Sequence, residues 1–322
     1  MLKTINIIED TIPAAWEKAV IETWTNGAEF PTDYDKPGDP PSRDASAQIL
    51  VTNPFKEPRI HRAFPGGLDD LWKYREEVIN GIHDHWCEPN STKWSYTYHR
   101  RLAQYPIVRI FAPDGKEKDP EIDTIDPSID KFEVDRVNQL EDIIADLKRA
   151  GFSRRAVAGL WRPYFDIKHP DPPCFNEMQC RISNDKKLVL QILIRSNDAF
   201  KAGFMNMFAF TELQKEIAAR LGVEPGEYCH HAFSFHIYGS YFSEFQGFLD
   251  TLKKRPKFED RTYTTEYAQD FFNEGRLALL NDCLDYPEKI LPRHHQIRIY
   301  NELPQEYRDN VDPRVRQMIS GR

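Results

Sequence analysis

The segment 175–195 restricts the possible folds more than any other part of the sequence. Residues 178–182 and 188–194 are apolar runs of strand length, and the turn formers Ser183-Asn184-Asp185 separate them, so the pattern predicts a β-hairpin. The second run is LVLQILI, apolar at almost every position, which is typical of a strand that is covered on both faces. We therefore expect a β-sheet at the centre of the fold.

Hydrophobic periodicity elsewhere predicts further elements of both kinds. Helices are predicted at 14–25, 68–82, 134–147 and 204–221, and strands at 47–51, 156–161 and 228–238. Because they alternate irregularly, we expect an α+β fold: a single domain, residues 1–322, with a mixed β-sheet flanked by helices. Within it, 1–65 forms a variable N-terminal part, 112–130 an exposed loop and 292–322 a polar C-terminal tail.

The composition argues against several classes of protein. The formal net charge of −8 disfavours a general binder of nucleic-acid phosphates, so we expect no nucleic-acid partner. No apolar run approaches the ~20 residues that a membrane-spanning helix needs, and the N-terminal MLKTINIIED lacks a signal-peptide core. The five cysteines form no CxxC pair and are odd in number, which favours a reducing compartment and no metal site. We expect a globular cytoplasmic protein without a membrane or metal partner.

Two motifs carry residue types suited to nucleophilic and phosphate chemistry. Pro172 and Pro173 stiffen the chain before Cys174, and a cysteine nucleophile needs a nearby cation that lowers its pKa. Arg195 and Ser196 end the second hairpin strand, where a guanidinium fork and a hydroxyl suit a phosphate group. A cysteine considered alone is more often an inert core residue, so this motif decides nothing by itself.

Polar residues on predicted helices and strands form a second group of candidates. Asn206 lies on an otherwise apolar predicted helix, and a buried amide must find partners, which invites a bound polar ring. His236 and Tyr238 alternate on a predicted strand and therefore face the same side. Arg154 and Arg155 follow a predicted helix and, as an isolated pair, would usually be solvated. Each residue has an ordinary structural explanation when it is taken alone.

The order of these motifs resembles that of the thymidylate synthase and deoxycytidylate hydroxymethylase family. Arg195 follows Cys174 by 21 residues, Asn206 follows Asp198 by eight, and His236 follows Asn206 by 30. The resemblance covers about 134–238, whereas YTYHRRL at 96–102 and RDASAQ at 43–48 match the family's tyrosine segment and arginine loop more loosely. The resemblance implies a thymidylate-synthase-like fold that forms a homodimer through the sheet.

The resemblance also implies a role for each residue. In the family a cysteine thiolate adds to C6 of a pyrimidine nucleoside 5′-monophosphate, and C5 then attacks the methylene of methylenetetrahydrofolate, the co-substrate. The implied catalytic residues are Cys174 as the nucleophile, Tyr98 in the proton-transfer network, Asp198 at the ring, and a glutamate as general acid and base. The implied substrate-binding residues are Arg43, Arg195 and Ser196 for the phosphate, Asn206 for the base, His236 and Tyr238 for the sugar, and Arg154 and Arg155, which reach the partner's site.

Two choices stay open at the implied site. Glu76 and Glu77 are adjacent on the helix predicted at 68–82, so only one can face the pocket; we assign the acid–base role to Glu77, the alternative being that both are solvated. Whether the substrate's pyrimidine base is uracil or cytosine is also open. Asparagine at position 206 favours uracil, because family hydroxymethylases for deoxycytidylate carry an aspartate there.

Three departures from the family pattern bear on the product. Phe175 follows the cysteine where synthases carry a histidine, the asparagine usual after the HxY strand is missing from Gly239-Ser240-Tyr241, and the chain ends QMISGR instead of a small apolar tail that closes over the folate. Without that closure water can attack the methylene, so we expect a 5-hydroxymethyl product from dUMP, dCMP or CMP. Thymidylate synthase activity is the alternative, and a non-catalytic RNA-binding or scaffold protein a remote one.

Overall fold

The computed structural model describes residues 1–87, 94–284 and 290–321. Its helices are α1 (Ile12–Asn26), α2 (Leu68–Asn80), α3 (Tyr98–Ala103), α4 (Gln139–Arg149), α5 (Pro163–Asp166), α6 (Gly203–Leu221), α7 (Phe242–Lys254), α8 (Thr265–Asn281), α9 (Arg293–Glu302), α10 (Gln305–Arg308) and α11 (Pro313–Ser320). Its strands are β1 (Thr4–Glu9), β2 (Ala28–Phe30), β3 (Ser42–Val51), β4 (Ile60–His61), β5 (Tyr105–Phe111), β6 (Glu117–Lys118), β7 (Lys131–Val137), β8 (Val157–Gly159), β9 (Phe175–Ile182), β10 (Lys187–Ile194), β11 (Asn197–Asp198), β12 (Glu224–Ile237) and β13 (Thr262–Tyr263).

The main sheet is mixed. Its strand order is β1-β3-β12-β10-β9-β8, with β2 beside β3 and β11 beside β12. Strand β12 runs parallel to β10 but antiparallel to β3, and the β1–β3 pair is parallel. The predicted α+β class, with a mixed sheet flanked by helices, is therefore confirmed.

The predicted hairpin is present as β9 and β10, which pair antiparallel. Alternate β10 side chains, Leu188, Leu190, Ile192 and Ile194, are at most 2% exposed. The side chains between them are only partly buried, so this chain covers one face of the strand fully rather than both. The helices of this chain therefore cover only one of the two apolar faces of β10 completely.

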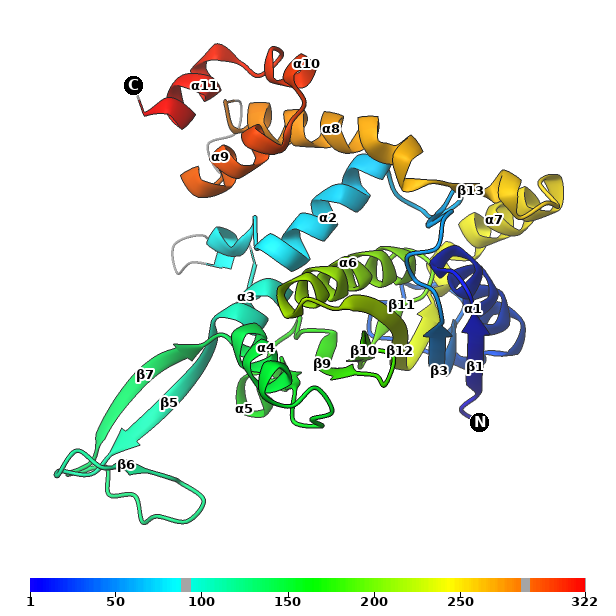
Figure 1. The fold of residues 1–322 in the computed structure, drawn as a ribbon. Coiled ribbons are helices and arrows are strands. Elements are labelled where there is room, and N and C mark those ends of the chain that lie inside the picture. The colour runs from blue at the N-terminus through cyan, green and yellow to red at the C-terminus, as the bar shows by residue number, and fades with distance from the viewer. Residues whose placement is uncertain (88–93, 285–289, 322) are drawn as a thin grey trace.

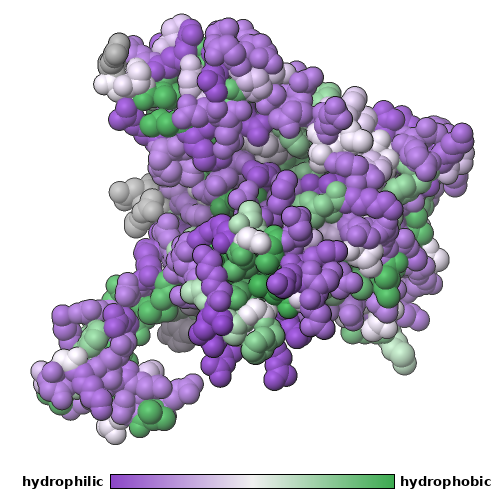
Figure 2. Space-filling model, viewed as in Figure 1, coloured by the Kyte–Doolittle hydropathy of each residue, from purple (hydrophilic) through white to green (hydrophobic). Residues whose placement is uncertain are grey.

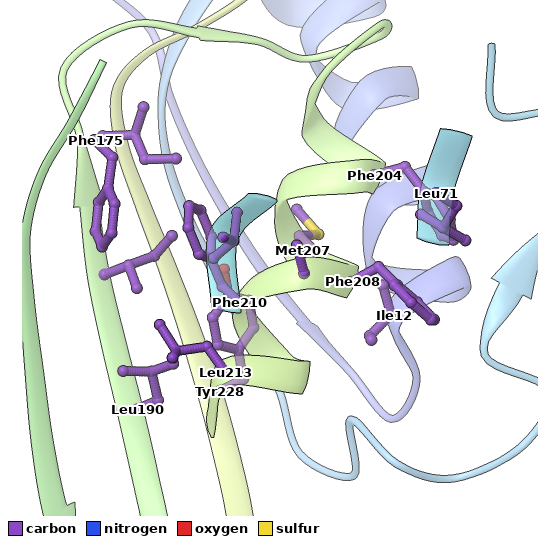
Figure 3. Close-up of a cluster of buried hydrophobic side chains, with 14 of the residues drawn as sticks. Ile12, Leu71, Phe175, Leu190, Phe204, Met207, Phe208, Phe210, Leu213 and Tyr228 are labelled. Carbon is purple, nitrogen blue, oxygen red and sulfur yellow. The ribbon is translucent and has the colours of Figure 1, made fainter. Parts of the chain in front are cut away.

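The helices form layers above the sheet (Figure 1). Helix α6 packs against β10 and β12 on one side and against α2 on the other, and α8 packs on α2 in turn. Figure 3 shows both faces of α6: Phe210 lies beside the sheet residue Tyr228, whereas Phe204 points the other way, toward Leu71 of α2. This two-sided burial explains why α6 is apolar nearly all round.

The helix predicted at 134–147 is wrong in its first part. Val134 and Val137 lie in β7, which pairs antiparallel with β5, and helix α4 begins only at Gln139. The side chain of Asn138 accepts hydrogen bonds from the backbone N–H groups of Leu140 and Glu141. That capping starts the helix after Asn138, so the helical spacing of the two valines is coincidental.

Strands β5, β6 and β7 form an arm that projects from the rest of the molecule (Figure 1). One face of this arm carries Val108 of β5 and Val134 of β7, which lie opposite each other and are 62% and 78% exposed. Figure 2 shows apolar atoms on this projecting part, whereas most of the visible surface is hydrophilic. The polar stretch 112–130 connects β5 to β7 and contains the short strand β6.

The C-terminal part, predicted from its composition as a polar tail, folds into α9, α10 and α11. Sparse apolar residues hold these helices in place: Leu303, Val311 and Val315 are at most 1% exposed. Helices α9 and α10 pack against α8, and α11 packs against α9. Among the helices in the described ranges, none has the length and apolarity needed to cross a membrane.

Candidate active site

Cys174 and Arg195 lie side by side because they flank the β9–β10 hairpin. The antiparallel register places Ile194 opposite Phe175, so the residues just outside the paired strands meet. The backbone N–H of Arg195 donates to the Cys174 carbonyl at 2.8 Å. Its guanidinium donates to the carbonyls of Pro173 (3.0 Å) and Pro172 (2.8 Å), and lies 3.7 Å from Cys174 Sγ. The two prolines thus hold the guanidinium against the sulfur.

The electrostatics of Cys174 reflect two opposing effects. Burial raises the pKa of the thiol, and the nearby Arg195 guanidinium lowers it. The carboxylate of Asp171 adds a smaller upward shift to the pKa. The net shift of the pKa is upward, so the thiol is protonated near pH 7, while Arg195 favours the thiolate when it forms.

A cavity of about 260 Å³ opens at Cys174 and collects most of the predicted residues. Those that line it are Tyr98, Cys174, Ser196, Asp198, Asn206, His236 and Tyr238. They come from elements far apart in sequence. They meet at the cavity because α2 packs on α6 and because β11 pairs with β12 beside the loop that carries Cys174. Tyr74, Asn197, Lys201, Ala202 and Met205 complete the lining.

One wall of this cavity is formed by Asn206 of α6 and two tyrosines. The hydroxyl of Tyr74 on α2 donates to Asn206 Oδ1 at 2.5 Å. Tyr98 packs edge-on against Phe175, with ring centroids 5.4 Å apart. Burial raises the pKa of Tyr74 and of Tyr98 well above 10, so both phenols are neutral donors near pH 7.

A chain of hydrogen bonds sets the proton position on His236. The hydroxyl of Ser234 donates to Asp44 Oδ2 at 2.7 Å, and His236 Nδ1 lies 2.9 Å from the same hydroxyl oxygen. Because that hydroxyl has a single proton, Nδ1–H of His236 must be the donor in the second contact. Burial lowers the pKa of His236 to about 4, so the ring is neutral and Nε2 is an acceptor. Within the described ranges this buried Nε2 finds no hydrogen-bond partner.

Asp198 shapes the neighbouring turn as well as lining the cavity. Its Oδ1 accepts hydrogen bonds from the backbone N–H groups of Phe200 (3.1 Å) and Lys201 (2.8 Å). Burial raises the pKa of this carboxyl to about 6, and the two backbone donors oppose the shift. The side chain therefore fixes the start of the loop between β11 and α6, beside the cavity wall.

The adjacent glutamates of α2 have different surroundings. Glu76 is fully buried and forms ion pairs with Arg75 and, at 2.6 Å, with Arg298 of α9. Glu77 lines a second cavity of about 640 Å³, and its Oε1 lies 2.8 Å from Nδ1 of His83. This second cavity shares Tyr74 and Tyr98 with the first. Glu77, and not Glu76, thus faces the second cavity, which adjoins the Cys174 cavity at Tyr74 and Tyr98.

Four predicted phosphate ligands do not line either cavity: Arg195, which instead lies against Cys174 Sγ, and Arg43, Arg154 and Arg155. Arg43, expected in a loop, lies in β3 opposite Ile237, because β3 extends back to Ser42, and it pairs with Glu29 at 3.3 Å. Arg154 and Arg155 are exposed in the loop between α4 and β8, the edge strand of the sheet.

The sequence reasoning missed Tyr74, Asp171 and Lys201. Tyr74 precedes Glu77 by three residues on α2, a spacing that puts both on one helix face, and this signal was available once Glu77 was proposed. Asp171 and Lys201 lie close in sequence to Cys174 and Asp198, in loops that carry no distinctive pattern.

Known proteins that are similar to this chain belong to one family. The sequence profile of the thymidylate synthase family matches residues 74–273, well over half of the chain. The chain belongs to the thymidylate synthase family. A protein of Methanocaldococcus jannaschii, provisionally named a thymidylate synthase, is 31% identical over 195 residues, covering 59% of this chain and 72% of the relative. A similarly named protein of Methanosarcina acetivorans is 26% identical over 227 residues, covering 70% and 86%.

A solved structure of the thymidylate synthase family was also found, the thermostable thymidylate synthase A of Bacillus subtilis. It aligns with a TM-score of 0.49 and 20% identity, over 72% of this chain and 82% of its own. Membership of the thymidylate synthase family makes the chain a one-carbon transferase of nucleotide biosynthesis, in a family that uses methylenetetrahydrofolate as co-substrate. In the described part of the chain, no three His, Cys, Asp or Glu side chains are grouped as a metal ion would require.

Proposed function

We propose that this protein transfers a one-carbon unit from methylenetetrahydrofolate to C5 of a pyrimidine nucleoside 5′-monophosphate, and that water completes the reaction to give a 5-hydroxymethyl product. The substrate is dUMP, dCMP or CMP. The observation that carries the proposal is the single cavity in which Cys174, Asn206 and His236 converge, with Arg195 against the sulfur. It offers a nucleophile, a base-pairing amide and a hydroxyl acceptor within one nucleotide-sized region.

The chain's own residues suit the nucleotide part of this reaction. The Cys174 thiolate adds to C6, which places the electron pair of the C5–C6 bond on C5, and Arg195 stabilises both the thiolate and the 5′-phosphate. Ser196 supplies a hydroxyl to the same phosphate. The unprotonated Nε2 of His236 accepts a hydrogen bond from a sugar hydroxyl, with Tyr238 beside it on the cavity wall.

The larger cavity suits the co-substrate and the proton transfers. Its aromatic walls, Trp94 and Tyr96, fit a flat heterocycle, and it joins the Cys174 cavity through Tyr74 and Tyr98. Methylenetetrahydrofolate supplies the electrophilic carbon there. Glu77 then serves as general acid and base, and Tyr98 donates a hydrogen bond to the water that relays the proton.

The position of the C-terminal helices supports water rather than hydride as the final reactant. The described residues that line the two cavities all lie between Tyr74 and Tyr238 in the sequence. Helices α9 to α11 instead pack on α8 and on each other, on the far side of α2 (Figure 1). Reductive methylation requires that water be kept from the exocyclic methylene, and a site not closed by these helices favours hydroxylation.

Product analysis tests this proposal. The protein is incubated with methylenetetrahydrofolate and, separately, dUMP, dCMP, UMP and CMP, and the nucleotides are analysed by mass spectrometry. We expect a gain of one CH2O unit without formation of dihydrofolate. A gain of CH2 together with dihydrofolate would instead identify a thymidylate synthase, because only reductive transfer oxidises the folate. Absence of any product with all four nucleotides would contradict the proposed activity.

We also propose that the protein acts as a homodimer in which Arg154 and Arg155 reach the partner's site. The helices α1 and α6 pack on one face of the sheet, and the opposite face keeps apolar side chains partly exposed, with Phe233 at 61%. A second copy that covers this face would bury them. It would also bring an anion to the two arginines, which are exposed in the loop beside the edge strand β8.

Mixing two inactive variants tests the shared site. One carries Cys174→Ser and the other carries both Arg154→Gln and Arg155→Gln. Each mixed dimer then holds one site with neither change, so random exchange restores about a quarter of wild-type activity. In the matched control, Cys174→Ser is mixed with Arg195→Gln. Since these residues serve the same subunit's site, no recovery is expected, and recovery there, or its absence in the first mixture, would contradict the shared site.

A further inference from the structure

Tyr74 and Asn206 meet across the packed helices α2 and α6, at the wall of the Cys174 cavity. The Tyr74 hydroxyl donates to Asn206 Oδ1 at 2.5 Å, a short contact for a neutral pair. Both side chains line the cavity. Among the described residues, this is the one hydrogen bond found for the Tyr74 hydroxyl, and none is found for Asn206 Nδ2. The contact thus decides which end of the amide remains for a ligand.

The direction of this hydrogen bond makes the two orientations of the amide unequal. The phenol is protonated near pH 7, so it needs an acceptor, and Oδ1 of Asn206 is the one it has. If the amide turned over, Nδ2–H would point at the phenol oxygen and the buried phenol proton would lose its acceptor. A buried donor without a partner is costly, so Tyr74 holds Oδ1 toward itself and leaves Nδ2 for the cavity.

We propose that Tyr74 is the residue that sets base specificity, by holding the Asn206 amide in the orientation that reads uracil. The C4 substituent protrudes further from a pyrimidine ring than N3 does, so the free Nδ2–H donor meets it first. Uracil presents the acceptor O4 at that position, whereas cytosine presents an amino group whose N–H would oppose Nδ2–H. The inference rests on the proposed function, since it assumes that the cavity takes a pyrimidine nucleotide.

The Tyr74→Phe variant tests the inference. Dissociation constants for dUMP and dCMP are measured by calorimetry in a Cys174→Ser background, so that no turnover interferes, and kcat/KM is measured for both nucleotides in the otherwise wild-type protein. We expect wild-type protein to prefer dUMP, and Tyr74→Phe to reduce that preference about ten-fold, in binding and in kcat/KM. Tyr98→Phe is the matched control, because it removes a phenol from the same cavity without touching Asn206. It should leave the ratio unchanged, whatever it does to the rates.

A second background separates positioning from packing. In Asn206→Asp the two side-chain oxygens are equivalent, so no orientation exists for Tyr74 to hold. Tyr74→Phe should therefore leave the dUMP to dCMP ratio unchanged in the Asn206→Asp background, although it changes the ratio in the wild type. An equal effect in both backgrounds would show that Tyr74 acts by another route and would overturn the inference.

The outcomes also distinguish this inference from the proposed function. If the protein binds both nucleotides and Tyr74→Phe leaves their ratio unchanged, the specificity role is overturned while the proposed function stands. A wild-type preference for dCMP that Tyr74→Phe abolishes would overturn the assignment of uracil. If the wild-type protein binds neither nucleotide, the proposed function fails and the inference fails with it.

Discussion

Replacing Cys174 by serine is expected to abolish turnover while nucleotide binding persists. A serine hydroxyl ionises far less readily than a thiol, and the side chain that contacts Cys174 Sγ in the described structure, Arg195, is a cation and not a base. We expect kcat/KM to fall by at least about a thousand-fold, a loss typical of removing a nucleophile. Because Arg195, Asn206 and His236 are unchanged, the dissociation constant of the nucleotide should shift by no more than a few-fold.

The first covalent step can be observed without the co-substrate. Addition of a thiolate to C6 makes C5 carbanion-like, so deuterium from D2O enters at C5 and the H5 resonance of the nucleotide disappears. Wild-type protein should catalyse this exchange and Cys174→Ser should not. The control is Cys180→Ala, which removes a fully buried cysteine of β9 whose pKa is raised to about 12. Exchange that continues in Cys174→Ser, or stops in Cys180→Ala, would contradict the assignment of the nucleophile.

The neighbourhood of Cys174 and Arg195 could be predicted from the sequence because its geometry is local. A hairpin with a short turn has a defined register, so two residues that flank its open end must meet. The same holds for Asn206, since an α6 that begins soon after Asp198 carries position 206 back over the cavity. In both cases the distance along the chain is short compared with the elements that set the geometry.

The hydrogen bonds that tune the site could not be predicted, because they join distant segments. Ser234 and Asp44 are 190 residues apart in sequence, and only the antiparallel pairing of β12 with β3 brings them together. Tyr74 and Asn206 are separated by 132 residues and meet only because α2 packs on α6. No periodicity in either segment indicates its partner. Both contacts control a ring or amide that the sequence did identify.

The C-terminal helices show what composition leaves out, because a polar composition does not indicate that residues 292–322 form helices. Their surface is so polar that a few well-placed apolar residues carry the packing, namely Ile299, Leu303, Val311 and Val315. Polar side chains carry the rest: Arg298 of α9 reaches the buried carboxylate of Glu76, next to the proposed acid and base Glu77. A segment that composition marked as a tail is therefore part of the support of the candidate site.

That support predicts a large loss of stability when Arg298 is replaced by methionine. The Glu76 side chain is 0% exposed, and it relies on Arg75, on Arg298 at 2.6 Å and on Asn80 at 2.8 Å. Removing one cation leaves a buried carboxylate undercompensated, whereas methionine keeps the apolar stem of the side chain. We expect the free energy of unfolding to fall by about 2–3 kcal/mol, below the full cost of breaking a buried pair because Arg298 is 28% exposed.

Urea denaturation measures this change, and the slope of the transition should be the same in the variant and the wild type, so that a shift of the midpoint reports stability. The matched control is Glu302→Gln, which breaks the more exposed Arg298–Glu302 pair and should cost less than about 1 kcal/mol. In Glu76→Gln, no buried charge remains for Arg298 to compensate, so Arg298→Met should cost clearly less there than in the wild type. An equal cost in both backgrounds would mean that α9 is held by its apolar contacts alone, and that Glu77 owes its position to α2 and α6 without help from the C-terminal helices.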